Sequence, residues 1–151
     1  MRLHRLLFGA WCALCACSHE VPPASPEAAA PTRSTAQLLN TYWKLTELGG
    51  QVLATPPGAR EIHFVLQSEN QRVAGFSGCN RMMGSYALEG DAIRFDQMGG
   101  TMMACVPDME LERKFLALFP QVARWRINGE TLRLLDADGK TLATFESRYL
   151  Q

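Results

Sequence analysis

Apolar and polar residues alternate along most of the chain after residue 38, and this period of two constrains the fold more than any other feature. Such alternation is typical of half-buried strands, because successive side chains point to opposite faces of a sheet. In the run from 62 to 66, for example, Ile62, Phe64 and Leu66 alternate with His63 and Val65. The runs are short and are separated by turn-forming residues, so we expect many short strands.

Glycine-containing turns separate the expected strands. Glu89-Gly90-Asp91 is a tight turn, and Asn128-Gly129 supplies the positive φ values that two-residue hairpin turns require. The segments with strand character are 42–48, 62–66, 73–76, 86–88, 93–95, 123–127, 132–134 and 142–145.

The stretch from Asp108 to Phe119 departs from this pattern, because Leu111, Phe115 and Leu118 recur there at helical spacing. Asp108 is a suitable N-cap residue for such a helix. The apolar stripe of the helix needs a sheet to cover. We therefore expect a mainly β (α+β) domain, a small antiparallel curled sheet or partly open barrel of about eight strands. One helix is inserted before the last three strands and closes the barrel in part.

The N-terminus has the pattern of an export signal. A basic start is followed by the apolar run Leu6 to Ala16, which is about half the ~20 residues needed to span a bilayer. Small residues directly before Cys17 resemble the bacterial lipobox, whose cysteine becomes the diacylated new N-terminus. We expect residues 1–16 to be a lipoprotein signal peptide and Cys17 to carry lipid. A plain secretory signal is the alternative.

Residues 17–37 are expected to form a lipid-anchored tether. This segment is rich in proline and alanine and has no aromatic residue, so it cannot bury a core. Extended proline-rich chain would hold the domain of residues 38–151 up to roughly 60 Å from the lipid. The serine after Cys17 resembles an outer-membrane sorting signal. The expected location is therefore the cell envelope, at the outer membrane facing the periplasm.

The charge balance argues against a nucleic-acid partner. The chain has 15 Lys+Arg and 15 Asp+Glu, so no excess of positive charge could track a phosphate backbone. The membrane is an expected partner through the N-terminal lipid, and an envelope protein or an apolar ligand is an expected second partner.

Little in the domain points to catalysis. His63 is its only histidine, so a Ser-His or Cys-His pair would have to use it, and it lies on the polar face of an expected strand. No carboxylate pair stands out as acid and base, and phosphate-binding glycine motifs are absent. We expect no catalytic residue, no cofactor and no metal site, and hence no enzyme.

Cys79 and Cys105, 26 positions apart, leave three alternatives open. An exported pair often forms a disulfide, and one across this loop would add roughly 3–4 kcal/mol to stability. The pair could instead be buried free thiols or part of a soft-metal site suited to copper(I). The methionines near the cysteines that could join such a site are Met82, Met83, Met98, Met102 and Met103.

The run Ser77-Gly78-Cys79-Asn80-Arg81, continued to Tyr86, closely resembles the META domain, also called the HslJ-like family. Thr101 to Cys105 resembles the second signature of that family. The resemblance covers about residues 38–148. The signature residues in this chain are Gly78, Cys79, Asn80, Arg81, Gly84, Thr101, Met103 and Cys105.

The resemblance implies a small β-rich envelope domain with a helix. Relatives are associated with heat shock, novobiocin resistance, secretion or motility, and no catalytic activity is established for them. We therefore expect a non-enzymatic, lipid-anchored domain that supports tolerance of envelope stress or antibiotics by binding a protein or an apolar ligand. The alternatives are a lipocalin-like lipid carrier and a pilot-like assembly protein for a secretion system.

Two interpretations of the signature are open. In the structural one, glycines 75, 78 and 84 permit positive φ at bends, Asn80 ties a loop to backbone amides, and Arg81 braces that loop. In the functional one, the same loop and residues 101–105 form one rim of a binding surface.

Overall fold

The computed structural model describes residues 35–105 and 109–149. The signal peptide, Cys17, the tether as far as residue 34 and the N-cap residue Asp108 lie outside these ranges. They remain predictions from sequence. Within the described residues, no helix combines the length and the apolar character needed to cross a membrane.

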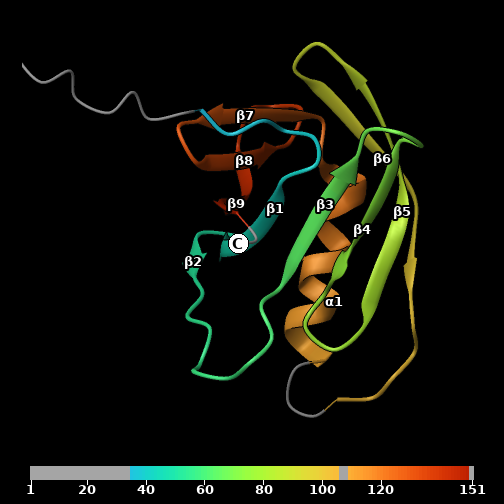
Figure 1. Cartoon of the computed structure of the whole chain (residues 1–151), viewed down its shortest axis with the longest axis vertical. Coiled ribbons are helices and arrows are strands. Elements are labelled where there is room, and N and C mark those ends of the chain that lie inside the picture. The colour runs from blue at the N-terminus through green and yellow to red at the C-terminus, as the bar shows by residue number, and fades with distance from the viewer. Residues whose placement is uncertain (1–34, 106–108, 150–151) are drawn as a thin grey trace, which may run out of the picture. The chain divides into compact units, whose positions relative to one another are not determined.

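The described ranges contain nine strands, one α-helix and one short 3-10 helix (Figure 1). The helix precedes the last three strands, as expected from sequence. The elements are β1 (Tyr42–Leu48), β2 (Gln51–Val52), β3 (His63–Gln67), β4 (Arg72–Phe76), β5 (Arg81–Glu89), β6 (Ala92–Gly100), α1 (Met109–Leu118), η1 (Phe119–Gln121), β7 (Arg124–Asn128), β8 (Thr131–Leu135) and β9 (Thr141–Arg148).

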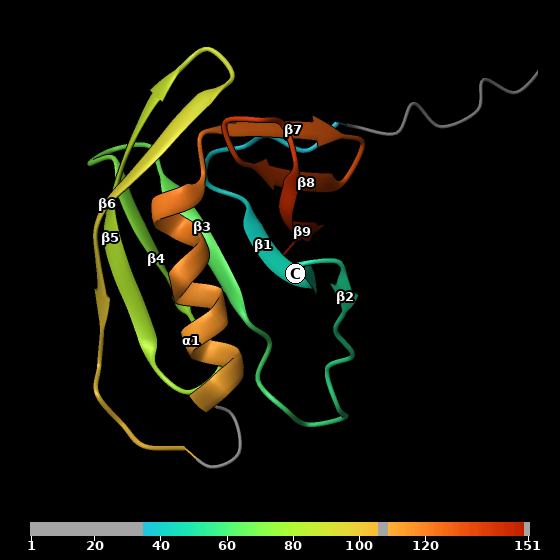
Figure 2. The same cartoon turned by 180° about the vertical axis from the view of Figure 1, so that it is seen from behind.

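All strands belong to one antiparallel sheet that curls into a ring. The order is β2-β1-β3-β4-β5-β6-β7-β8-β9, and β1 also pairs with β9. The ring is weakest between β6 and β7, which pair only at Ala92 and Arg124. Helix α1 lies against the sheet (Figure 2). The expected curled sheet with one inserted helix is confirmed, with nine strands instead of about eight and without a cleanly closed barrel.

Two hairpins have the same type of turn. Gly90 (φ 60°) lies in the β5–β6 turn and Gly129 (φ 61°) in the β7–β8 turn. Glu89 pairs with Ala92, and Asn128 pairs with Thr131, so each turn has two central residues, of which the glycine is the first. The expected positive φ at Asn128 is therefore wrong. Asn128 is the last residue of β7, and Gly129 alone supplies the reversal.

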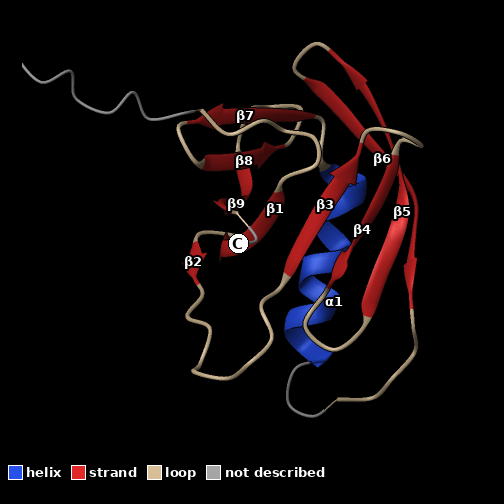
Figure 3. Ribbon diagram, viewed as in Figure 1, coloured by secondary structure: helices blue, strands red, loops and turns tan. Residues whose placement is uncertain are grey.

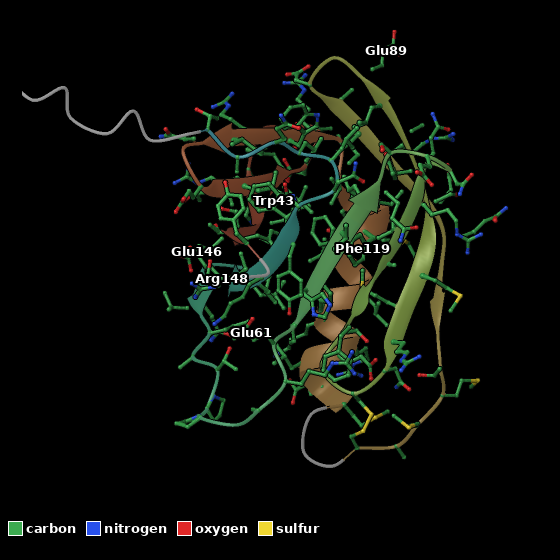
Figure 4. The ribbon with its side chains drawn as sticks, viewed as in Figure 1. Trp43, Glu61, Glu89, Phe119, Glu146 and Arg148 are labelled. Carbon is green, nitrogen blue, oxygen red and sulfur yellow. A yellow bond between two sulfur atoms is a disulfide. The ribbon has the colours of Figure 1, made fainter. Side chains whose placement is uncertain are left out.

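Aromatic side chains fill the space between the sheet and the helix. Phe64, Phe115, Phe119 and Phe145 are almost fully buried, and their rings meet edge to face. The Phe64 and Phe145 ring centroids are 4.9 Å apart. Trp43 and Phe119 both point inward in Figure 4. Such ring pairs add about 0.5–1.5 kcal/mol each beyond the area they bury, so this cluster anchors the ring of strands.

Helix α1 buries one face against the sheet. Figure 3 shows the helix in blue and the strands of the sheet in red. Its buried residues are Glu112, Phe115 and Leu118, whereas Leu111 is only half-buried. The expected apolar stripe is thus confirmed at Phe115 and Leu118. One turn before Phe115, however, the inward-facing position is held by the carboxylate of Glu112.

Candidate functional site

The signature begins in a tight loop, Ser77 to Asn80, that joins β4 to β5. The amide of Ser77 donates a hydrogen bond to the carbonyl of Asn80 at 2.9 Å. Gly78 adopts a φ of 121°, which side chains on L-residues rarely allow, so glycine is required here. This short loop carries two buried polar side chains, Ser77 and Asn80, toward helix α1.

Positive φ values were also expected at Gly75 and Gly84, and this expectation is wrong. Gly75 and Gly84 lie inside strands β4 and β5 and do not have positive φ values. A Cβ on Gly75 would overlap the His63 carbonyl and lie 2.9 Å from the Phe64 Cα, and one on Gly84 would lie 3.0 Å from the Asp96 carbonyl oxygen. Both positions therefore need glycine because neighbouring chain passes too close for a side chain.

The side chain of Asn80 joins the signature loop to the segment after β6. Its Oδ1 accepts hydrogen bonds from the Thr101 hydroxyl at 2.7 Å and the Met103 amide at 2.8 Å. Its Nδ2 donates to the Met103 carbonyl and to Glu112 Oε2, each at 3.1 Å. All four hydrogen-bonding positions of the amide are used, so Asn80 fixes residues 101–103 in place.

Glu112 connects the same loop to helix α1. Its Oε1 accepts hydrogen bonds from the Ser77 hydroxyl and, at 3.2 Å, from the Asn80 backbone amide. Together with the Asn80 side-chain contact, these bonds satisfy a carboxylate that is almost completely buried. Burial of such a group is costly without partners. The three residues therefore form one buried unit, which we call the Ser77–Asn80–Glu112 network.

Cys79 and Cys105 are joined in a disulfide with their Cα atoms 5.7 Å apart. The structure thus takes one of the three alternatives that the sequence left open. The bond fastens the end of the Thr101–Cys105 segment to the signature loop. In Figure 4 the yellow disulfide lies at the end of the molecule where α1 begins.

An open pocket with a volume of about 760 Å³ lies at the surface between the Thr101–Cys105 segment and the first turns of α1. Three exposed methionines line it: Met102 is 99% exposed, Met103 57% and Met109 45%. Leu116 and Ala104 add further apolar surface. We call this surface the methionine pocket. Exposed apolar side chains gathered in one hollow are characteristic of binding sites.

The remaining signature residues support the pocket from its edge. The backbone of Arg81 holds Thr101 twice: its amide donates to the Thr101 hydroxyl at 3.2 Å, and its carbonyl accepts from the Thr101 amide at 3.1 Å. The Arg81 side chain is exposed. The main chain of Arg81 therefore braces the loop. The sequence-based interpretation gave this role to Arg81 without distinguishing its main chain from its side chain.

His63 lies away from the methionine pocket, on the outer side of β3. Its ring stacks on Tyr42 with centroids 4.1 Å apart, and Nδ1 lies 2.9 Å from the Glu61 carbonyl. Burial lowers the pKa of His63. Burial and the nearby Glu61 carboxylate raise the pKa of Tyr42, while a hydrogen bond from Lys44 lowers the pKa of Glu61. Figure 4 labels Glu61 on this side of the molecule.

The comparisons with known proteins agree with the signature. The family model described as META domain matches residues 36–149. The chain belongs to the META domain family. A solved structure, described as an NMR structure of a protein from Burkholderia xenovorans, has 29% sequence identity and a TM-score of 0.61. The matched region spans 85% of this protein and 99% of the Burkholderia xenovorans protein.

A second solved structure, described only as an NMR structure of a protein, shares the fold with a TM-score of 0.58 at 20% identity. The matched region spans 73% of this protein and 91% of the second solved structure. The search of the curated proteins found no match. Membership of the META domain family and its fold are thus shown.

Sequence reasoning missed the burial of Glu112 and the role of Ser77. An acid in the first turn of a helix is favourable on any face, but Glu112 lies three residues before Phe115 and therefore on the same helical face. That spacing was the available signal. Met109 was also missed, because it lies apart from the methionines near the cysteines. Of those, Met82 is buried and Met98 is packed against the core.

Proposed function

We propose that this META domain is a non-enzymatic, lipid-anchored component of the cell envelope. It supports tolerance of envelope stress or of antibiotics of the novobiocin type by binding a protein or an apolar ligand. The binding surface is the methionine pocket. Support for export comes from the N-terminal sequence, and support for binding comes from the pocket.

The observation that carries the proposal is the exposure of Met102, Met103 and Met109 around one hollow. Methionine is flexible and polarisable, so a surface made from it adapts to apolar partners of differing shape. The segment beneath the side chains is held firmly by Asn80 and the disulfide. A rigid support with adaptable side chains suits a binding surface, because little backbone order must be gained on association.

The packing of the interior disfavours the lipocalin-like carrier. Phe64, Phe115, Phe119 and Phe145 occupy the space between sheet and helix, where a carrier would hold its lipid. The methionine pocket is instead open to solvent, between the Thr101–Cys105 segment and α1. A pilot-like role with a protein partner remains compatible with an outer surface of this kind.

The test is genetic complementation in the source bacterium. Deletion of the gene is expected to increase sensitivity to novobiocin and detergent, and the unaltered gene is expected to restore tolerance. The triple variant Met102→Glu, Met103→Glu and Met109→Glu is expected to fail, since charge at these positions opposes apolar contact.

Met83→Glu is the matched control, because Met83 is similarly exposed (47%) but lies on β5 and does not line the methionine pocket. It is expected to complement fully. Full complementation by the triple variant, at normal protein levels, would refute the pocket as the binding surface. Unchanged tolerance of the deletion strain under several envelope stresses would refute the stress role.

A further inference from the structure

The methionine pocket combines three thioether side chains, and this chemistry is more specific than apolar character alone. Six of the seven methionines of the chain lie in the described residues, and three of these six line this single pocket. Leucine would provide the same apolar surface. Thioether sulfur differs from leucine in one property that matters here: it is a soft ligand suited to copper(I), which leucine cannot bind.

Two separate segments of the chain bring these three methionines into the lining of one pocket. Met102 and Met103 belong to the segment after β6, which Asn80 fixes through the Met103 amide and carbonyl. Met109 is the first residue of α1, and Glu112 ties that end of the helix to Asn80. The buried network thus holds both methionine-bearing segments together, and each flexible side chain can swing its sulfur toward a common centre.

Other metal chemistries have little support in the same region. Within residues 35–105 and 109–149, no group of three His, Cys, Asp or Glu could hold a metal ion. The Cys79 and Cys105 sulfurs are bonded to each other and are not available as thiolates. Of the carboxylates beside the pocket, Glu112 is occupied by Ser77 and Asn80, and Glu110 pairs with Lys114 at 2.8 Å. The remaining soft donors are the thioethers.

Although the sequence analysis led us to expect no metal site, we propose that Met102, Met103 and Met109 form a binding site for a soft monovalent cation, copper(I). The three neutral sulfurs coordinate the ion at the mouth of the pocket, and the Ser77–Asn80–Glu112 network positions the segments that carry them. The proposal does not require a protein or lipid partner. It assigns to the same surface a second, chemically distinct ligand.

Silver(I) is the probe, because it has the same ligand preference as copper(I) without its redox chemistry. The purified protein is first treated with N-ethylmaleimide, which blocks free thiols and leaves the disulfide intact. Silver uptake is then measured by native mass spectrometry and by competition with a chromophoric chelator. The unaltered chain is expected to bind one more silver ion than the triple variant Met102→Leu, Met103→Leu and Met109→Leu.

The control is Met83→Leu, which removes an exposed methionine outside the pocket and is expected to retain full uptake. Met102→Leu alone alters a side chain that is almost fully exposed, so the fold is preserved, and it is expected to weaken silver binding about tenfold or more. A thioether carries no ionisable proton, so uptake should be the same at about pH 7.5 and about pH 5.5.

Equal silver uptake by the unaltered chain and the triple leucine variant would overturn the proposal, as would an equal loss in Met83→Leu. The leucine variant also separates this proposal from the proposed function. It keeps the apolar surface, so it should still complement the deletion strain while losing silver. The glutamate variant should lose complementation.

Discussion

The Glu112 carboxylate and the Asn80 side-chain amide meet in a buried hydrogen bond of 3.1 Å, although the residues are 32 positions apart and lie on different elements. Glu112 also accepts the backbone amide of Asn80. The other end of the Asn80 side chain holds Thr101 and Met103. One contact between a helix and a loop therefore determines where the methionine-bearing segment lies.

Replacement of Glu112 by alanine is expected to be strongly destabilising. It leaves the Asn80 backbone amide and one hydrogen of the Asn80 side-chain amide without their buried acceptor, whereas the Ser77 hydroxyl still lies 2.9 Å from the Asn80 carbonyl. Each unsatisfied buried group costs about 1–3 kcal/mol. We expect the free energy of unfolding in urea to fall by about 2–4 kcal/mol. Glu110→Ala is the control on the same helix and should lower the free energy of unfolding by no more than about 0.5 kcal/mol, because Glu110 is exposed and loses only a surface ion pair with Lys114. Equal effects of the two substitutions would contradict a special role for Glu112.

Loss of the Cys79–Cys105 disulfide is expected to destabilise the domain through the unfolded state. A bond that closes a loop of 26 positions contributes about 3.5 kcal/mol in the chain-entropy model. The double variant Cys79→Ala and Cys105→Ala should show this loss in urea unfolding. Intact protein should be lighter than its reduced form by the mass of two hydrogens. Identical masses before and after reduction of the native protein would show that the bond is absent.

Gly75 and Gly99 provide a matched pair of strand glycines. A Cβ at Gly75 would overlap the His63 carbonyl, whereas one at Gly99 would meet nothing within 4 Å. We expect Gly75→Ala to lower the free energy of unfolding by about 1–3 kcal/mol, the usual cost of overpacking. Gly99→Ala should have little effect. The same loss in both variants would indicate that strand glycines are required for a reason other than close contact.

His63 should make stability depend on pH in a defined direction. Burial lowers its pKa below the ordinary 6.5, so the folded protein resists protonation at pH values where the unfolded chain binds a proton. The contribution is therefore fully present above about pH 6.5 and is lost as pH falls toward the folded pKa.

Urea unfolding at about pH 7.5 and about pH 5.5 measures this dependence, which cannot exceed about 1.4 kcal/mol per pH unit for one group. His63→Phe keeps a ring against Tyr42 but does not titrate, so its stability should fall less over this range. A larger fall in the variant would mean that the sign is wrong.

Local patterns in the sequence were sufficient to predict the architecture. Alternation placed Phe64 and Leu66 on the buried face of their strand, and helical spacing identified α1 before the last three strands. The expected turn at Asn128-Gly129 was displaced by one residue, because a single positive φ at Gly129 satisfies the reversal. Such details depend on register, which short-range patterns define poorly.

The candidate site was only partly predictable. Family signatures identified Cys79, Asn80 and Cys105, but no local rule shows that Asn80 reaches Glu112, which is 32 positions later. A carboxylate in the first turn of a helix is favourable whether exposed or buried, so its chemistry alone did not reveal its burial. The methionine pocket depends on contacts between distant segments and becomes evident only when β6 and α1 are placed side by side in the fold.

Photocrosslinking in living cells tests the central claim, that the methionine pocket is the surface through which this domain acts. A benzophenone amino acid at position 102 reports contacts at the pocket, and the same probe at position 83 reports contacts on β5. The account predicts a discrete crosslinked protein or lipid from position 102 that is absent from position 83. Identical crosslinks from both positions, or none from position 102 in stressed cells, would contradict it.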